Sequence, residues 1–311
     1  MLPLRAGLLL IALLFWAAPL RAESERGSIR NNANGVLAVL GLSIVPSETA
    51  SAITIKTDGE DDAHFRAIQL GGAFTVSDEF PLYLEGFVGA ARYDPSFIFE
   101  EDEELSKVDA RWDSLAGTIG VGWDFALTDE LVIRPIGNLS LGVVESDATF
   151  AGDGLEAVSQ AEAEFLDDGE LRAYGYGGSL MLDWERYRED YLIDAELRYT
   201  HITIRTFDSS SNAVQGSSDA ITLGFWGRLR VPTELNAFGR PLRALGEVAA
   251  SRLIGDQSDV LRTDNLFQIG GGVEFDFGAK ESFPITRGRV VGRYLFGGGA
   301  TGFSLGLAVS F

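Results

Sequence analysis

The sequence predicts an all-β fold: a transmembrane antiparallel up-and-down β-barrel of about 12 strands, with short periplasmic turns and long acidic extracellular loops. Three observations predict it. Apolar residues alternate with small or polar ones in segments of about 9–12 residues, which is long enough to cross a bilayer at a tilt. Short and long acidic connections alternate between these segments. The segment Gly302–Phe311 carries its apolar side chains on one face and ends in an aromatic residue.

The N-terminal residues 1–22 are predicted to be a cleaved signal peptide. Arg5 precedes an apolar run from Ala6 to Ala18, and Ala22 supplies a small residue at the expected cleavage site. The run is too short for a transmembrane helix, which needs about 20 apolar residues. The mature chain is then divided into two parts: residues 23–34, a short periplasmic segment, and residues 35–311, the barrel.

Composition and charge narrow the class of protein. The chain has no Cys, so no disulfide stabilises it in an oxidising compartment. The formal net charge of −21 argues against nucleic acid as a partner, because phosphates are bound by Lys and Arg. The 37 Gly residues and the aromatic content of 11% are typical of curved strands with aromatic girdles. A soluble exported β-protein has a similar composition, so the strand pattern has to decide between them.

The alternation of apolar residues predicts each strand in turn. In Arg66–Val76, for example, Ile68, Leu70 and Phe74 share one face, and in Ser114–Leu127 the same holds for Leu115, Ile119 and Val121. The expected strands are Gly35–Val45, Arg66–Val76, Leu82–Tyr93, Ser114–Leu127, Leu131–Val144, Leu171–Trp184, Tyr191–Ile204, Ala220–Val231, Leu242–Leu253, Leu266–Phe277, Arg287–Phe296 and Gly302–Phe311.

The connections between these strands give the expected orientation. If the C-terminus is periplasmic, the long acidic segments Asp94–Ala110 and Glu145–Glu170 face outward, and the turns Ser77–Glu79, Thr128–Glu130 and Arg188–Asp190 face the periplasm. The expected aromatic girdles are Trp123, Phe125 and Trp184 at the periplasmic side and Tyr174, Tyr176 and Tyr199 at the outer side. The lipid-facing residues of the expected C-terminal targeting strand are Phe303, Leu305, Leu307, Val309 and Phe311.

Charged residues of both signs are predicted to face the lumen. Buried charges are costly unless they are paired, and consecutive strands supply opposite signs, as in Asp124 beside Arg134. We therefore expect a belt of Arg–carboxylate pairs around the periplasmic half, as scaffolding of the barrel in preference to a selectivity filter. The expected members are Glu85, Asp124, Arg134, Asp183, Asp194, Glu196, Arg198, Arg228, Arg230, Arg243, Glu247, Glu274, Asp276, Arg289 and Arg293.

These features together resemble the β-domain of an autotransporter. The shared features are an exported chain of about twelve strands, inward charges on most of them, and the terminal segment Gly302–Phe311. Such domains follow a large secreted passenger and a helix that threads the pore. Only Glu23–Asn34 precedes the first expected strand, so we expect no passenger, and the chain resembles the solitary outer membrane autotransporter-like β-barrels. The resemblance implies an outer-membrane location and the fold, and it implies no activity.

The expected function is that of a structural or passive-transport barrel, a small pore without enzymatic activity. The lumen is expected to hold water or the inward-folded segments Asp94–Ala110 and Glu145–Glu170. One alternative is an outer-membrane hydrolase of the lipid or lipopolysaccharide deacylase type, which would use His201 with the nearby hydroxyl of Thr203. Another is an adhesin or receptor that uses its acidic loops, such as Glu100–Glu104.

The expected partners follow from this location. They are outer-membrane lipid, lipopolysaccharide and, during insertion, the barrel-assembly machinery. We expect a monomer with no cofactor and no metal site, because the acidic loops lack the spacing of a defined calcium loop.

Overall fold

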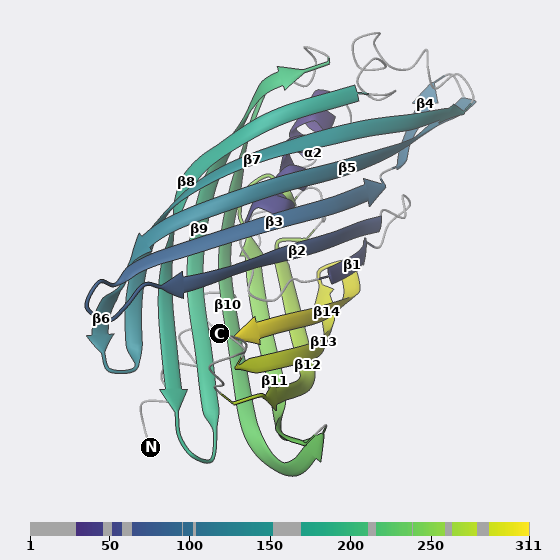
Figure 1. The fold of residues 1–311 in the computed structure, drawn as a ribbon. Helices are drawn as coiled ribbons and strands as arrows, with labels where there is room; N and C mark the ends of the chain where they lie inside the picture. Colours follow the sequence, from purple (N-terminus) through teal and green to yellow (C-terminus); the bar gives the residue numbers. More distant parts are fainter. Residues whose placement is uncertain are drawn as a thin grey trace.

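The structure is a computed structural model in which twelve antiparallel strands form a closed barrel with one helix inside (Figure 1). The residues described are 29–45, 52–57, 64–94, 96–101, 104–151, 169–210, 216–237, 239–258, 263–278 and 286–310. The helix is α2 (Ile29–Ile44). The strands are β1 (Ala52–Thr57), β2 (His64–Thr75), β3 (Leu82–Asp94), β4 (Ser96–Glu101), β5 (Glu104–Trp123), β6 (Phe125–Thr128), β7 (Leu131–Ala151), β8 (Gly169–Tyr187), β9 (Leu192–Ser209), β10 (Ser217–Ala237), β11 (Arg240–Leu253), β12 (Asn265–Asp276), β13 (Arg287–Gly297) and β14 (Ala300–Ser310).

The ring is an up-and-down barrel that closes between β1 and β14. Each strand of the ring pairs antiparallel with its neighbours in sequence, while β4 extends the sheet beside β5 and β6 pairs with β7. The predicted all-β antiparallel barrel is thus confirmed. We call the end with the turns at 77–80 and 188–191 the short-turn end, and the opposite end, with the connection 152–168, the long-loop end.

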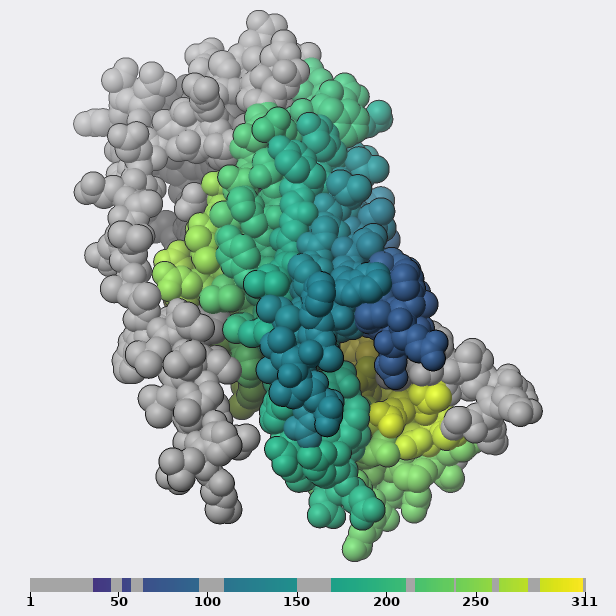
Figure 2. Space-filling model, turned by 90° about the vertical axis from the view of Figure 1, so that its left-hand side faces the viewer, coloured from purple at the N-terminus to yellow at the C-terminus, as the bar shows by residue number. Residues whose placement is uncertain are grey.

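The strand that closes the ring is short. β1 has 6 residues and pairs with Ala300–Leu305 of β14 and with His64–Ile68 of β2. Among the described residues, Gln69–Thr75 and Gly306–Ser310 therefore have a strand partner on one side only. Figure 2 shows a hollow between the blue and the yellow segments of the wall.

The outward face of the wall is apolar. Successive side chains of a strand point to opposite faces, and the exposed residues of β2 and β14 are mostly apolar, with Arg66 and Thr301 as exceptions toward the long-loop end. Leu70 is 67% exposed, Phe303 is 70% exposed and Leu307 is 64% exposed. An apolar surface that continues around a protein is a liability in water and is stable against hydrocarbon, so the outer wall is suited to a membrane.

One strand expectation was wrong. Gly35–Val45 is not the first strand, because these residues belong to α2, and residues 29–34, expected in a periplasmic segment, begin that helix. The short segment Ala52–Thr57, in which Ile53 and Ile55 alternate with Thr54 and Lys56, is the first strand instead. Residues 1–22 lie outside the described residues. Among the helices that are described, none has the length and apolarity needed to cross a bilayer.

A second difference concerns the acidic segments. Residues expected in the loop Asp94–Ala110 form β4 and the start of β5, which pair as a hairpin from Ser96↔Asp109 to Glu101↔Glu104. The segment after Val144 likewise continues β7 as far as Ala151. Strand pairing beyond the apolar belt satisfies the backbone hydrogen bonds of these polar residues, which is why they extend the sheet. Residues 152–168 lie outside the described residues.

Candidate functional site

The lumen in the long-loop half of the barrel is occupied by α2. Figure 1 shows the helix inside the ring, between the long-loop end and the middle of the wall. Val36, Leu37, Val39 and Leu40 are 0% exposed, although they point to different sides of the helix. Because the part of the helix from Val36 to Leu40 is apolar on every side, it requires apolar surroundings. The inward side chains of the wall supply them, among them Ile55, Phe65, Trp112, Val144, Leu171, Ile202, Ile204 and Leu295.

The C-terminal end of α2 is bound to the wall by hydrogen bonds. The last carbonyl groups of a helix have no partner within the helix and need one elsewhere. The side-chain amide of Gln69 donates to the Ser43 carbonyl at 3.3 Å and to the Val45 carbonyl at 3.1 Å. The Thr118 hydroxyl donates to the Ile44 carbonyl at 2.8 Å. These bonds fix the height of the helix in the lumen.

Two wall glycines give α2 its space. A Cβ atom at Gly142 would lie 2.5 Å from Leu40 Cδ1, and one at Gly89 would lie 2.8 Å from the Ser43 carbonyl oxygen. Any side chain at these positions would collide with the helix. The Ser43 and Ser114 hydroxyl oxygens are 3.3 Å apart, so helix and wall are in direct contact here as well.

An ion pair crosses the lumen below the helix. Arg198 on β9 donates to both carboxylate oxygens of Glu85 on β3, at 2.7 and 2.9 Å, although these strands are not neighbours in the ring. The Glu85 carboxylate also accepts hydrogen bonds from Asn138 at 2.7 Å and from Tyr83 at 3.1 Å. The Glu85 side chain is 0% exposed. Four hydrogen bonds and the Arg198 charge offset the cost of burying the Glu85 carboxylate, so this network forms a stable connection across the lumen.

The short-turn half of the lumen holds a continuous network of charges on β9 to β13. Asp194 pairs with Arg230 at 2.9 Å, and Arg230 pairs with Glu274 at 3.2 Å. The remaining ion pairs are Arg243–Glu274 (2.9 Å), Arg243–Asp276 (2.8 Å), Arg289–Glu274 (3.9 Å), Arg228–Asp194 (3.3 Å), Arg228–Glu247 (3.8 Å) and Arg293–Glu247 (2.7 Å).

A second charge group lies on β7, β8 and the link between β5 and β6. Arg134 binds Asp124 through two nitrogens, contacts Asp183 at 3.3 Å and stacks over the Tyr83 ring at 4.0 Å. Burial alone would raise the pKa of Asp124, but hydrogen bonds from Arg134 and Thr75 and the charge of Arg134 lower it below its ordinary value. Asp124 is therefore held ionised.

The expected belt residues are thus distributed over three groups. The Asp124–Arg134–Asp183 group and the β9–β13 network lie near the short-turn end, and Arg198 reaches across the lumen to Glu85. Arg289 contacts Glu274 at 3.9 Å. Glu196 lines a cavity of about 160 Å³ beside the C-terminal half of α2, together with Arg198 and Trp226.

The aromatic residues expected in the girdles lie on the outward face or near the strand ends. Tyr174 and Tyr176 stack with ring centroids 6.1 Å apart, and Tyr199 is exposed. Trp123 meets Phe80 edge-on at 5.2 Å. Phe125 is exposed and Trp184 is half-buried. On β14, Phe303, Leu305, Leu307 and Val309 all face outward, and Phe311 lies outside the described residues.

The His201 group does not have the geometry of a nucleophile and its base. The Thr203 hydroxyl donates to Asp219 Oδ1 at 2.7 Å, and the His201 Nε2 atom lies 3.3 Å from the same oxygen. The hydroxyl is therefore bound to the carboxylate and not to the imidazole that would remove its proton. His201 and Asp219 are exposed on the outer wall, and Thr203 between them is half-buried.

Several functional residues were not among those expected from the sequence. They are the helix residues themselves, the capping side chains Gln69 and Thr118, and Asn138 beside Glu85. The polar residues shared a signal, because each is a polar residue at an inward position of its strand. Among the described residues, no three His, Asp or Glu side chains come together as metal ligands would.

The barrel is similar to translocator barrels of autotransporters. The transport unit of AIDA-I from Escherichia coli matches with a TM-score of 0.47 and 11% identity, over 92% of this chain and 100% of that chain. The β-domain of the Bordetella autotransporter BrkA matches with a TM-score of 0.44 and 14% identity, over 84% of this chain and 98% of that chain. The translocator domain of NalP from Neisseria meningitidis matches with a TM-score of 0.43 and 14% identity, over 84% of this chain and 86% of that chain.

The resemblance found in the sequence is thus seen again among solved structures. At these identities and scores, no role is transferred from those proteins to this chain. No family model matches the chain, and neither does any curated protein with which it was compared.

Proposed function

We propose that this chain is an outer-membrane barrel that its own helix α2 keeps closed, so that its role is structural and not that of a passive pore. The supporting observation is the position of α2, whose residues Val36–Leu40 are buried in the lumen and whose C-terminal carbonyls are bound by Gln69 and Thr118. The short-turn end faces the periplasm, as the turns and the C-terminal strand of outer-membrane barrels do.

The lumen would be closed at two levels. An ion entering from the long-loop end would meet the apolar contact between α2 and the wall, where there are few groups to replace its hydration shell. An ion entering from the short-turn end would meet the Glu85–Arg198 pair. The cavity of about 160 Å³ between these levels is large enough for a few water molecules. A second candidate function, a narrow pore, would have to use this cavity.

Single-channel recording in planar bilayers tests the proposal. The full chain should show no regular conductance steps, and a chain that begins at residue 46 should conduct, because it lacks α2. Folding of both is checked by the change in gel mobility on boiling. Regular steps from the full chain, equal to those of the shortened chain, would favour the narrow pore and refute the closed barrel.

A further inference from the structure

The outward face of β1, β2 and β3 changes from apolar to charged toward the long-loop end, where Lys56, Arg66 and Arg92 stand beside the carboxylate of Asp94, which lies opposite His64. Across β2 and β3, the pair Ile68↔Ala90 is followed, two residues nearer the long-loop end, by Arg66↔Arg92. Lys56 on β1 is also exposed and faces the same side, opposite His64. Three cations thus lie next to one another directly above the apolar belt, in a chain whose formal net charge is −21.

This arrangement is unfavourable unless an anion compensates it. Like charges directly opposite each other on neighbouring strands destabilise a sheet. Arg92 is partly compensated, since it donates to both carboxylate oxygens of Asp113 at 2.6 and 3.0 Å. Arg66 and Lys56 form no ion pair with any residue that the structure describes. The site therefore has at least one cation on each of two strands available to a ligand.

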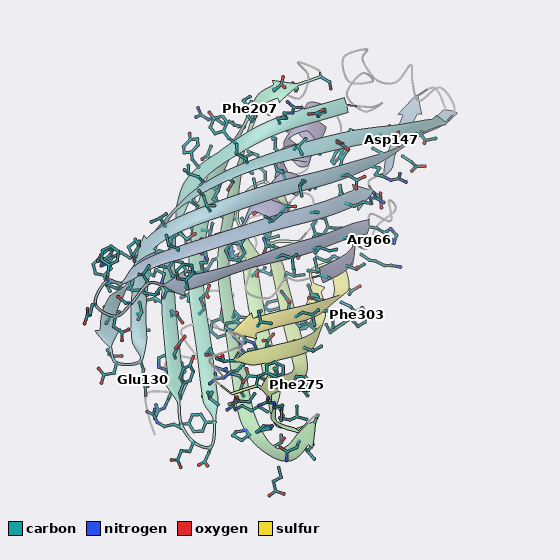
Figure 3. All side chains as sticks on the ribbon, in the orientation of Figure 1. Arg66, Glu130, Asp147, Phe207, Phe275 and Phe303 are labelled. Carbon is teal, nitrogen blue, oxygen red and sulfur yellow. The ribbon has the colours of Figure 1, made fainter. Side chains whose placement is uncertain are left out.

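The surface below the cations is apolar and exposed. Ile68 is 56% exposed and Phe303 is 70% exposed. Thr54 on β1 lies between Phe303 and Arg66, because it pairs with Phe303 on one side and with Arg66 on the other. Figure 3 shows Arg66 and Phe303 projecting from the same side of the barrel, with Arg66 nearer the long-loop end. A ligand that matches this surface carries a negative charge at one end and hydrocarbon at the other.

We propose that Lys56, Arg66 and Arg92 bind a phosphate group of lipopolysaccharide, with its acyl chains against Ile68 and Phe303. Guanidinium groups bind phosphate oxygens bidentately, and none of the described residues forms an ion pair with Arg66. The proposal rests on the orientation given above, in which the long-loop end lies in the outer leaflet, where this lipid is found.

The acidic connection 58–63 offers a competing partner for these cations. It contains Asp58, Glu60, Asp61 and Asp62 and lies outside the described residues. If its carboxylates neutralise Lys56 and Arg66, the site would bind no lipid phosphate. The experiment below separates the two cases, because only a free site retains the lipid.

Retention of lipid A by the folded full chain in detergent micelles tests the proposal, with bound lipid counted by mass spectrometry after gel filtration. The variant carrying Lys56→Gln and Arg66→Gln should retain about tenfold less lipid A than the wild type. The matched control carries Arg205→Gln and Arg252→Gln, which remove two outward cations from β9 and β11, and should retain as much as the wild type. The wild type should retain dephosphorylated lipid A no better than the Lys56/Arg66 variant retains intact lipid A.

Three results would overturn the proposal. They are equal retention by the wild type and the Lys56/Arg66 variant, an equal loss in the control variant, and full retention of the dephosphorylated lipid. Both variants must show the mobility change on boiling that marks a folded barrel. The measurement does not depend on whether α2 closes the lumen, so its failure is distinguishable from failure of the conductance test.

Discussion

The contact between Leu40 and Gly142 allows a double-mutant test of how α2 is seated. Leu40 is 0% exposed, and its Cδ1 atom occupies the space into which a side chain at Gly142 would project. Leu40→Ala should therefore lower the free energy of unfolding by about 2–5 kcal/mol, as other fully buried leucines do. Gly142→Ala places a Cβ atom 2.5 Å from Leu40 Cδ1 and should cost about 1–3 kcal/mol through overpacking.

The two changes should compensate each other. In the double variant, the new methyl group at position 142 enters the space that Leu40 leaves. The combined loss should then be smaller than the sum of the single losses by about 1 kcal/mol or more. Urea unfolding of the barrel in lipid vesicles, followed by tryptophan fluorescence, measures all four free energies of unfolding.

A matched control uses a glycine on the other face of the wall. Gly72 points outward, and a Cβ atom built there meets nothing within 4 Å. Gly72→Ala combined with Leu40→Ala should be additive within about 0.5 kcal/mol. Additivity of the Leu40 and Gly142 changes themselves would refute the reasoning, because it would mean that the helix does not rest on this part of the wall.

The other predictions concern the charges and the histidine. Arg243→Leu should lower the stability of the barrel by about 3–5 kcal/mol, because it leaves the fully buried Glu274 with one pairing partner fewer, and it should leave the conductance unchanged; a changed ion selectivity with normal stability would instead favour a filter. The pKa of Asp124 in the folded chain is lowered from its ordinary value near 3.8. The stabilisation that Asp124 gains from pairing with Arg134 is therefore fully present above pH 3.8, and it is lost as the pH falls through the lowered pKa. Between pH 7 and pH 3, the free energy of unfolding should thus fall more for the wild type than for Asp124→Asn. An equal fall in both proteins would contradict this. His201→Ala should have the same lipid-hydrolysis rate as the wild type, at background, and hydrolysis by the wild type alone would contradict the geometry.

The strands of the wall were predictable because lipid imposes a simple rule on them. Each strand has to show apolar side chains on its outward face, so the alternation in β2 and β14 marks both the strand and its orientation. The charges near the short-turn end were predictable for the same reason, since positions such as Asp194 and Glu274 fall on the inward face.

The helix was not predictable from the same pattern. Gly35–Val45 is a short apolar run, and such a run fits a strand or a buried helix equally well. What decides is that Val36–Leu40 are buried on every side, which only the complete barrel provides. The Glu85–Arg198 pair was missed for a related reason. Opposite charges were expected on neighbouring strands, whereas the curvature of the wall brings these two together across the lumen.

The most direct test of the account is a disulfide between α2 and the wall. The chain has no Cys, and the hydroxyl oxygens of Ser43 and Ser114 are 3.3 Å apart in a buried contact. If the helix lies in the lumen at this height, the folded variant with Ser43→Cys and Ser114→Cys should form an intramolecular disulfide on mild oxidation, detected as a loss of two hydrogens by mass spectrometry. The account is contradicted if both thiols of the folded barrel stay reduced and react with a maleimide.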